Sequence, residues 1–323
     1  MFRYIVRRVM WLVFVLLVIT FITYLIFFVM PPTDPAVIFA GKQPTPELVA
    51  EVRVQFGLNH AWPVQYALFV KRIFLGDQWG WPGFAFSFYT RSALKPIILS
   101  RMWVTLQLAI GAAVFWLMLG IPIGILSALR PRSAFDRMAM GFALFGVSAP
   151  VFFLGPLFLY IFYFKLGISA LSSGYYPIGT YGFGPWFSHF LMPWVVLALL
   201  YAAFYARMTR ANLIETMGQD YIRTARAKGL SERTVVLKHG LRASLTPVVT
   251  MFGLDLGGLL GGAFITETVF NLPGIGAYAI QSVFRGDLYA IADVTLIAGF
   301  FITFMNLVVD ILYAFLDPRV RYA

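Results

Sequence analysis

Long apolar runs separated by shorter polar segments dominate the chain. Six of these runs are long enough to cross a bilayer as helices, which takes roughly 20 residues each. They are Val9–Met30, Met102–Leu129, Met138–Phe164, His189–Ala206, Leu245–Phe270 and Ile291–Leu316. Helices are expected because an open strand would leave unpaired backbone groups in hydrocarbon. The pattern therefore predicts an all-α polytopic membrane protein with six transmembrane helices.

The composition agrees with a membrane protein. Hydrophobic residues make up 60% of the chain and charged residues only 12%, whereas about a quarter of a soluble domain is charged. The net charge of +11 could indicate nucleic-acid binding, but 16 of the 25 Lys and Arg residues fall in segments on one side of the predicted spans. Basic residues accumulate on the cytoplasmic side, which predicts that both termini are cytoplasmic and explains the charge without nucleic acid.

Several features of the chain limit how it can be processed and which chemistry it can carry out. The first apolar run holds about 20 residues, longer than the 7–15 of a signal-peptide core, and predicts a retained span. The chain has no Cys, which excludes disulfides and thiolate metal sites. Zinc-protease, serine-hydrolase and phosphate-loop motifs do not occur in the sequence. A membrane enzyme is therefore disfavoured, and no metal or cofactor is expected in this chain.

The segment between the first two spans, residues 31–100, is too long for a simple connector. It contains a predicted helix with Thr45 as N-cap, Pro46 in the first turn and Gly57 as the stop. Apolar residues Leu48, Val49, Val52 and Phe56 share one face of that helix. Two interpretations stay open: a helical cap packed on the outer ends of the spans, or a contact surface for an external binding protein.

Small and polar residues inside the spans are candidates for packing and transport. Gly253, Gly257 and Gly261 recur every four positions, which favours close helix contact within the subunit, at a subunit interface or along a mobile wall. Ionisable and polar groups within membranes are functional candidates. We assign Asp255, Glu267 and Asn306 to a speculative pathway or gate, and a structural hydrogen bond is the alternative for Asp255.

A basic, water-soluble segment lies between the fourth and fifth runs. Tyr221–Lys228 has the composition of a short helix, Gly229 suits a left-handed turn, and Ser231 can cap a second helix with Glu232 in its first turn. Pro247 falls in the opening turns of the next span, where its missing N–H costs least. The segment could lie on anionic lipid or fit a groove on a cytosolic partner.

The stretch RTARAKGLS, residues 223–231, resembles the EAA loop of membrane subunits in ABC importers, with Gly229 at the key glycine position. Other stretches resemble the B-type permease of dipeptide and oligopeptide importers, among them MPPTDPA, SAPVFFLG and ETVFNLPGIG. Their order covers essentially the whole chain. The acidic-Ala-Ala start of the loop is replaced by Arg223-Thr224-Ala225, a form common in the peptide-type group.

The resemblance implies a type I importer permease fold in three parts. Residues 1–100 would hold the first transmembrane helix and an extracytoplasmic loop region, and residues 101–316 the transmembrane domain with a cytoplasmic coupling loop at 207–244. Residues 317–323 would form a cytoplasmic tail. The protein is expected in a bacterial or archaeal cell membrane.

The resemblance also implies partners: a homologous second permease, two cytosolic ATPases that bind ATP and Mg²⁺, an extracytoplasmic substrate-binding protein and a peptide substrate. The residues implied to couple this chain to the ATPases are Arg223, Thr224, Ala225, Arg226, Ala227, Lys228, Gly229, Leu230, Ser231, Glu232 and Arg233. Small Ala225 and Ala227 would allow tight docking, and the cations Arg226, Lys228 and Arg233 would meet acidic groove edges. The alternatives are nickel, glutathione or oligosaccharide cargo, or a secondary transporter or channel that works alone.

Overall fold

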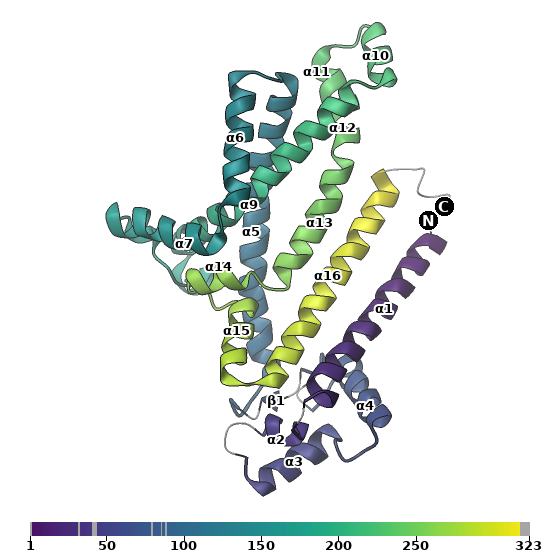
Figure 1. Ribbon diagram of the computed structural model, residues 1–323, viewed down its shortest axis with the longest axis vertical. Helices are drawn as coiled ribbons and strands as arrows, with labels where there is room; N and C mark the ends of the chain where they lie inside the picture. Colours follow the sequence, from purple (N-terminus) through teal and green to yellow (C-terminus); the bar gives the residue numbers. More distant parts are fainter. Residues whose placement is uncertain are drawn as a thin grey trace. The chain divides into compact units, whose positions relative to one another are not determined.

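The computed structural model describes residues 2–31, 33–40, 44–78, 80–84, 86–87 and 89–316 (Figure 1). The predicted tail 317–323 lies outside the described residues. Within them the chain is mainly helical, with one short β-hairpin. The elements are α1 (Phe2–Tyr24), α2 (Pro35–Phe39), α3 (Pro46–Phe56), α4 (Trp62–Leu75), β1 (Phe86–Ser87), β2 (Ser92–Ala93), α5 (Leu94–Leu129), α6 (Ala134–Ser148), α7 (Val151–Phe158), α8 (Ile178–Tyr181), α9 (Phe183–Met217), α10 (Asp220–Ala227), α11 (Glu232–Thr234), α12 (Leu241–Ser244), α13 (Thr246–Leu260), α14 (Phe264–Val269), α15 (Ile275–Arg285) and α16 (Leu288–Leu316).

The chain folds as two compact units that each combine distant segments. Unit 1 contains the residues up to Leu106 together with Gly257–Phe264 and Pro273–Leu307. Unit 2 contains Gln107–Leu256, Ile265–Leu272 and the residues from Val308 onward. The long helices α5, α13 and α16 contribute residues to both units.

Four continuous helices in the described part of the chain are long and apolar enough to cross a membrane: Arg3–Val29, Leu94–Leu129, Phe183–Met217 and Leu288–Leu312. They correspond to the first, second, fourth and sixth predicted runs. The fourth run was predicted too short, because α9 continues well beyond its apolar core. A fifth candidate span combines Glu232–Ser244 with Thr246–Leu260, which are bent by 48° at the break between them.

The third and fifth predicted runs are not single helices. The third run divides into α6 and α7, and α7 begins directly after Pro150, which has no N–H to continue the hydrogen-bond ladder of α6. The fifth run ends as α13 at Leu260, and α14 starts at Phe264. Gly262 between them has a φ of +124°, a conformation that residues with a side chain rarely adopt. Pro150 and Gly262 thus interrupt the helices although the apolar sequence continues through both positions.

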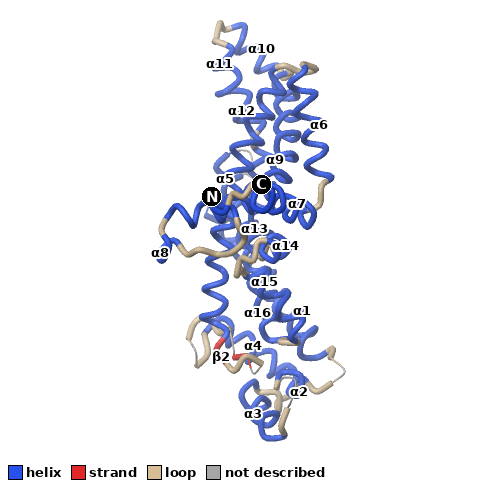
Figure 2. Tube along the Cα trace, turned by 90° about the vertical axis from the view of Figure 1, so that its left-hand side faces the viewer, coloured by secondary structure: helices blue, strands red, loops and turns tan. Residues whose placement is uncertain are grey.

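Helices α2, α3 and α4, the outer region expected from the sequence, pack on the ends of α1 and α16 in unit 1, and Figure 2 shows them gathered beside the β-hairpin. The predicted caps of α3 are confirmed: the Thr45 side chain accepts the N–H of Leu48 at 3.3 Å, and the helix ends at Gly57. Val52 and Phe56 are buried in a core shared with α1 and α16. The ring of Tyr289 on α16 stacks on Phe56 with centroids 4.3 Å apart.

The predicted glycine series lies where helices approach each other. A Cβ on Gly257 would lie 3.0 Å from Cβ of Met305, and one on Gly261 would lie 3.0 Å from Cβ of Ala298, both on α16. Gly253 is buried in α13. Gly257 and Gly261 therefore permit close packing within the chain itself, one of the alternatives open for this series.

Candidate cytoplasmic coupling segment

The segment between α9 and α13 has the local structure that its sequence predicts. Helix α10 ends at Ala227, and Gly229 turns the chain with a φ of +75°. The Ser231 side chain accepts the N–H of Thr234 at 3.4 Å and so caps α11. A π-helical stretch, Val235–Gly240, then leads into α12. Both figures show α10 and α11 beyond the α5–α6 turn, at one end of unit 2 (Figures 1 and 2).

A small apolar core holds the two arms of this segment together. Ile222 and Val235 are fully buried, and Ala225 between them is 7% exposed. Met217, at the end of α9, packs against the same core. Ala225 therefore fills the interior of the segment in this structure, whereas Ala227 is exposed. Of the two alanines expected at a docking surface, Ala227 is the one whose side chain is accessible.

The charged residues of the segment differ in their partners. Arg226 makes a two-point contact with Glu232, with Nε 3.0 Å from Oε2 and Nη2 2.6 Å from Oε1. These hydrogen bonds from Arg226 lower the pKa of Glu232. Arg223 contacts Asp220 at 3.3 Å. Lys228 and Arg233 form no ion pair with the described residues.

The base of the segment is fixed to α9. A Cβ on Gly240 would lie 2.9 Å from Sδ of Met217 and 3.3 Å from Cδ1 of Leu213, so the returning arm touches α9 directly. Near α12, the side chain of Asn212 donates to the carbonyl oxygen of Ser244 at 3.3 Å. Close packing together with hydrogen bonding makes the base of the segment and the end of α9 one structural element.

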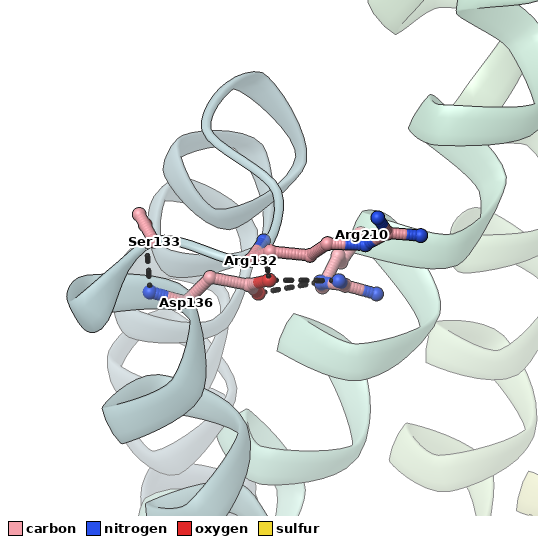
Figure 3. A network of polar contacts seen from close by, with 4 residues as sticks. All are labelled: Arg132, Ser133, Asp136 and Arg210. Carbon is pink, nitrogen blue, oxygen red and sulfur yellow. Dashed lines mark hydrogen bonds and ion pairs between the residues drawn. The ribbon is translucent and has the colours of Figure 1, made fainter.

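A second anchor joins α9 to the start of α6 (Figure 3). Arg210 on α9 donates from Nε to Oδ1 of Asp136 at 2.6 Å and from Nη2 to Oδ2 at 2.8 Å. The Asp136 carboxylate also accepts the N–H of Arg132 at 2.8 Å, and Ser133 Oγ accepts the N–H of Asp136 at 3.1 Å. The Asp136 side chain is 4% exposed. The hydrogen bond from Arg210 is the main reason why the pKa of Asp136 is lowered.

Sequence reasoning missed this anchor. The spacing of Ser133 and Asp136 matches a capping box and could have predicted where α6 begins. The partnership with Arg210, however, joins residues 74 positions apart. Periodicity and local capping signals carry no information about a contact of that separation.

The residues assigned to a pathway or gate occupy different environments. Asp255 on α13 is partly exposed, and its Oδ2 accepts the hydroxyl of Tyr205 on α9 at 2.7 Å. Glu267 on α14 is fully buried. Asn306 is partly exposed on α16, in unit 1. The hydrogen bond considered for Asp255 is therefore present, and an accessible part of its carboxylate remains.

These contacts define a mechanical arrangement. The compact tip formed by α10 and α11 is built on the end of α9, and Arg210 connects α9 to the α5–α6 turn. Fold and site together define a polytopic α-helical membrane protein with a compact, polar segment between α9 and α13.

The comparison with protein families identifies this class. The family "Binding-protein-dependent transport system inner membrane component" matches residues 120–322, and the N-terminal component of the same systems matches residues 1–109. The chain belongs to this family, and it is a multi-pass inner-membrane permease of the type I ABC importer class that includes peptide permeases. The resemblance to this class seen in the sequence is thus confirmed.

Curated relatives match the chain over its full length. The glutathione transport system permease protein GsiC is 37% identical in Salmonella typhimurium and in Escherichia coli K12, covering 100% of both chains. The dipeptide transport system permease protein DppB of Alkalihalophilus pseudofirmus is 35% identical, again over 100% of both chains. A solved structure of the MetNI methionine ABC transporter in an inward-facing conformation has a TM-score of 0.55 at 19% identity, covering 69% of this chain and 98% of that chain. This last likeness supports the shared fold.

Proposed function

We propose that this chain forms one half of the membrane pathway of an ATP-driven peptide importer and that residues 223–233 couple it to cytosolic ATPases. The coupling role is supported by the local structure of the segment. Its tip has its own apolar core around Ala225, a glycine turn at its end and a base fixed to α9. A solvated connector would need none of these features.

Lipid contact is the main alternative for the segment. An interfacial helix exposes a wide apolar face to the bilayer, but the apolar residues Ile222 and Val235 of this segment are buried against each other. The exposed surface carries Lys228 and Arg233 next to the Gly229 turn. A compact tip with accessible cations fits an acidic groove on a protein better than a membrane surface.

The proposed complex contains three kinds of partner protein, and a peptide is its cargo. A homologous but different permease would complete the pathway, and two cytosolic ATPases would bind ATP and Mg²⁺ beneath it. An extracytoplasmic binding protein would deliver the peptide. This chain itself would have no ATPase site, and both of its termini would be cytoplasmic, as the distribution of Lys and Arg favours. Closure of the ATPases would move the tip and, through α9, the spans.

The cargo is assigned from the class of the relatives, which includes a dipeptide permease and a glutathione permease. Both ligands are small peptides, although glutathione contains a side-chain amide linkage. We therefore propose di- and oligopeptides as cargo, with glutathione as the second candidate. Nickel and oligosaccharides, considered from the sequence, stay as further alternatives.

Reconstitution tests the proposed function. The chain would be co-expressed with the second permease, ATPases and binding protein encoded beside it, and the purified complex would be placed in proteoliposomes. We expect peptide-loaded binding protein to stimulate ATP hydrolysis and peptide uptake together. Stimulation by glutathione alone would select the second cargo. Peptide uptake by this chain without any ATPase would contradict the proposal.

A further inference from the structure

The Asp255 carboxylate has a hydrogen-bond partner among the described residues for only one of its two oxygens. One oxygen accepts the Tyr205 hydroxyl at 2.7 Å. The other oxygen accepts no hydrogen bond from the described residues, and no Lys or Arg among them forms an ion pair with this carboxylate. The Asp255 carboxyl group is therefore held in place by Tyr205 and has no cationic partner within this part of the chain.

The partial exposure of Asp255 limits which surroundings its carboxyl group can have. The residue is partly exposed, and it lies nine residues after the start of α13, which places it about 13.5 Å along the helix axis. Charged groups inside a membrane span turn toward a water-filled cavity or a polar partner rather than toward lipid. Asp293 on α16, by contrast, is 1% exposed and therefore lies inside the fold. Asp255 is thus available to a ligand or partner outside its own unit.

Aromatic residues lie close to Asp255 on α13 and on the neighbouring helix α9. Tyr201 and Tyr205 lie one helical turn apart on α9, and Phe252 and Asp255 lie close to one turn apart on α13. Trp116 on α5 is fully buried behind them. Its ring centroid lies 4.6 Å from that of Tyr201, 6.1 Å from Tyr205 and 6.2 Å from Phe252. Tyr201 and Phe252 are themselves partly exposed.

The packing behind the rings makes the arrangement rigid. A Cβ on Gly120 of α5 would lie 2.8 Å from Cβ of Tyr205 and 2.9 Å from the carbonyl oxygen of Ala202. Helices α5 and α9 are therefore in direct contact beside Tyr205. The indole N–H of Trp116 is buried without a hydrogen-bond partner among the described residues.

A carboxylate held by Tyr205 on a helix face with neighbouring aromatic residues is suited to an organic ammonium group. The carboxylate supplies charge and a hydrogen-bond acceptor, and the faces of Tyr and Phe rings attract cations. A transition metal such as nickel needs several nitrogen, oxygen or sulfur ligands, and the described residues contain no group of three or more His, Asp or Glu positioned to hold one. The chemistry therefore favours an ammonium ion over a metal ion.

We propose that Asp255, with Tyr201 and Phe252 beside it, binds the positively charged amino terminus of a peptide during its passage through the membrane. This inference rests on the proposed function and adds the chemical group that the pathway recognises. Tyr205 is a positioning residue that fixes the carboxylate, and Trp116 supports Tyr201 from behind.

Photo-cross-linking in the assembled importer tests the site. Met251 is partly exposed and lies one turn before Asp255 on α13, so Met251→p-benzoylphenylalanine places a photoreactive group beside the site without altering it. We expect radiolabelled tri-alanine to label this chain. Unlabelled tri-alanine in 100-fold excess should reduce labelling at least tenfold, whereas N-acetyl-tri-alanine, which lacks the ammonium group, should reduce it less than twofold. Equal competition by the two peptides would overturn the proposal.

A matched pair of variants removes or keeps the charge. Asp255→Asn should lower labelling by tri-alanine at least tenfold, while Asp255→Glu should keep it within threefold. Unchanged labelling in Asp255→Asn would contradict the proposal. A different pair of results would assign Asp255 to an ion pair between subunits. In that case the second permease would be lost from purified Asp255→Asn complexes, and both peptides would compete equally in the parent complex. Failure of the proposed function can be distinguished from failure of this site, because in the first case the unmodified complex would import no tri-alanine.

Discussion

The anchor between α9 and α6, taken here as part of the base, and the tip formed by α10 and α11 each contain an arginine in a two-point contact with a carboxylate, but their surroundings differ. At the base, the Asp136 side chain is 4% exposed and also accepts a backbone N–H. At the tip, Arg226 and Glu232 are 42% and 59% exposed. Burial makes the first pair costly to break, whereas water and salt weaken the second. The same chemistry thus fixes the base and leaves the tip able to exchange partners.

Asp136→Asn should have the largest effect on stability. It leaves Arg210 without its carboxylate, and because Arg210 is partly exposed we expect a loss of about 2–3 kcal/mol in the free energy of unfolding, below the ~3–5 of a fully buried pair. Denaturation of the purified protein by SDS, followed by tryptophan fluorescence, measures it. Asp220→Asn is the control, since the Asp220 side chain is 95% exposed. Equal effects of the two variants would contradict the difference between base and tip.

The same residue gives a pH dependence with a defined sign. The pKa of Asp136 is lowered in the folded protein, so its stabilising contribution is complete above the ordinary Asp value of about 4 and is lost as the pH falls through the lowered pKa. Stability of the parent protein should therefore fall more steeply below pH 4 than that of Asp136→Asn.

Ala225→Leu and Ala227→Leu separate internal packing from docking. Ala225 is 7% exposed in the core of the tip, and overpacking such a site costs about 1–3 kcal/mol. We expect Ala225→Leu to open the tip to trypsin even in the isolated chain. Ala227→Leu should leave the isolated chain resistant to trypsin and weaken only the binding of the ATPases. If both variants were equally sensitive to trypsin, the assigned core of the tip would be wrong.

Gly229→Val and Gly229→Asn test the turn at the tip. Space for a side chain exists, because an added Cβ would have no atom within 4 Å among the described residues. The φ of +75° is the obstacle, and a left-handed residue other than Gly or Asn costs roughly 1–2 kcal/mol. Gly229→Val should reduce peptide transport per ATP hydrolysed about tenfold, and Gly229→Asn should stay near the parent. Normal coupling in Gly229→Val would argue against the turn as a docking element.

Glu232→Gln should have the smallest effect. The Arg226–Glu232 pair is exposed, so the free energy of unfolding should not change measurably in SDS titrations. Without the negative charge, Arg226 becomes a third available cation beside Lys228 and Arg233. Binding of the ATPases should then become tighter at low salt, and the gain should disappear at high salt. A clear loss of stability would show that the tip depends on this pair.

The sequence was most informative where structure depends on local chemistry. The caps at Thr45 and Ser231 and the turn at Gly229 were predicted correctly, because each involves residues only a few positions apart. The breaks after α6 and α13 were missed, although Pro150 and Gly262 stood in the sequence as signals. Apolar composition dominated that interpretation, and it does not distinguish a continuous span from a broken one.

The contacts that position the candidate sites could not be predicted. Asp136 and Arg210 are 74 positions apart, and Tyr205 and Asp255 are 50 apart. Which residues meet over such separations depends on how helices pack, and a single sequence does not contain that register. The same limit explains why Ala225 was assigned to a docking surface: its neighbour Val235 comes from the returning arm.

Protection of the tip by the ATPases tests the proposed coupling most directly. The chain contains no Cys, so Lys228→Cys gives a single labelling site at the tip, and Val54→Cys, 73% exposed on α3, gives a control in the outer helical region. The account predicts that bound ATPases slow maleimide labelling at residue 228 at least tenfold and leave residue 54 unaffected. An unchanged labelling rate at residue 228 in a complex that retains its ATPases would contradict it.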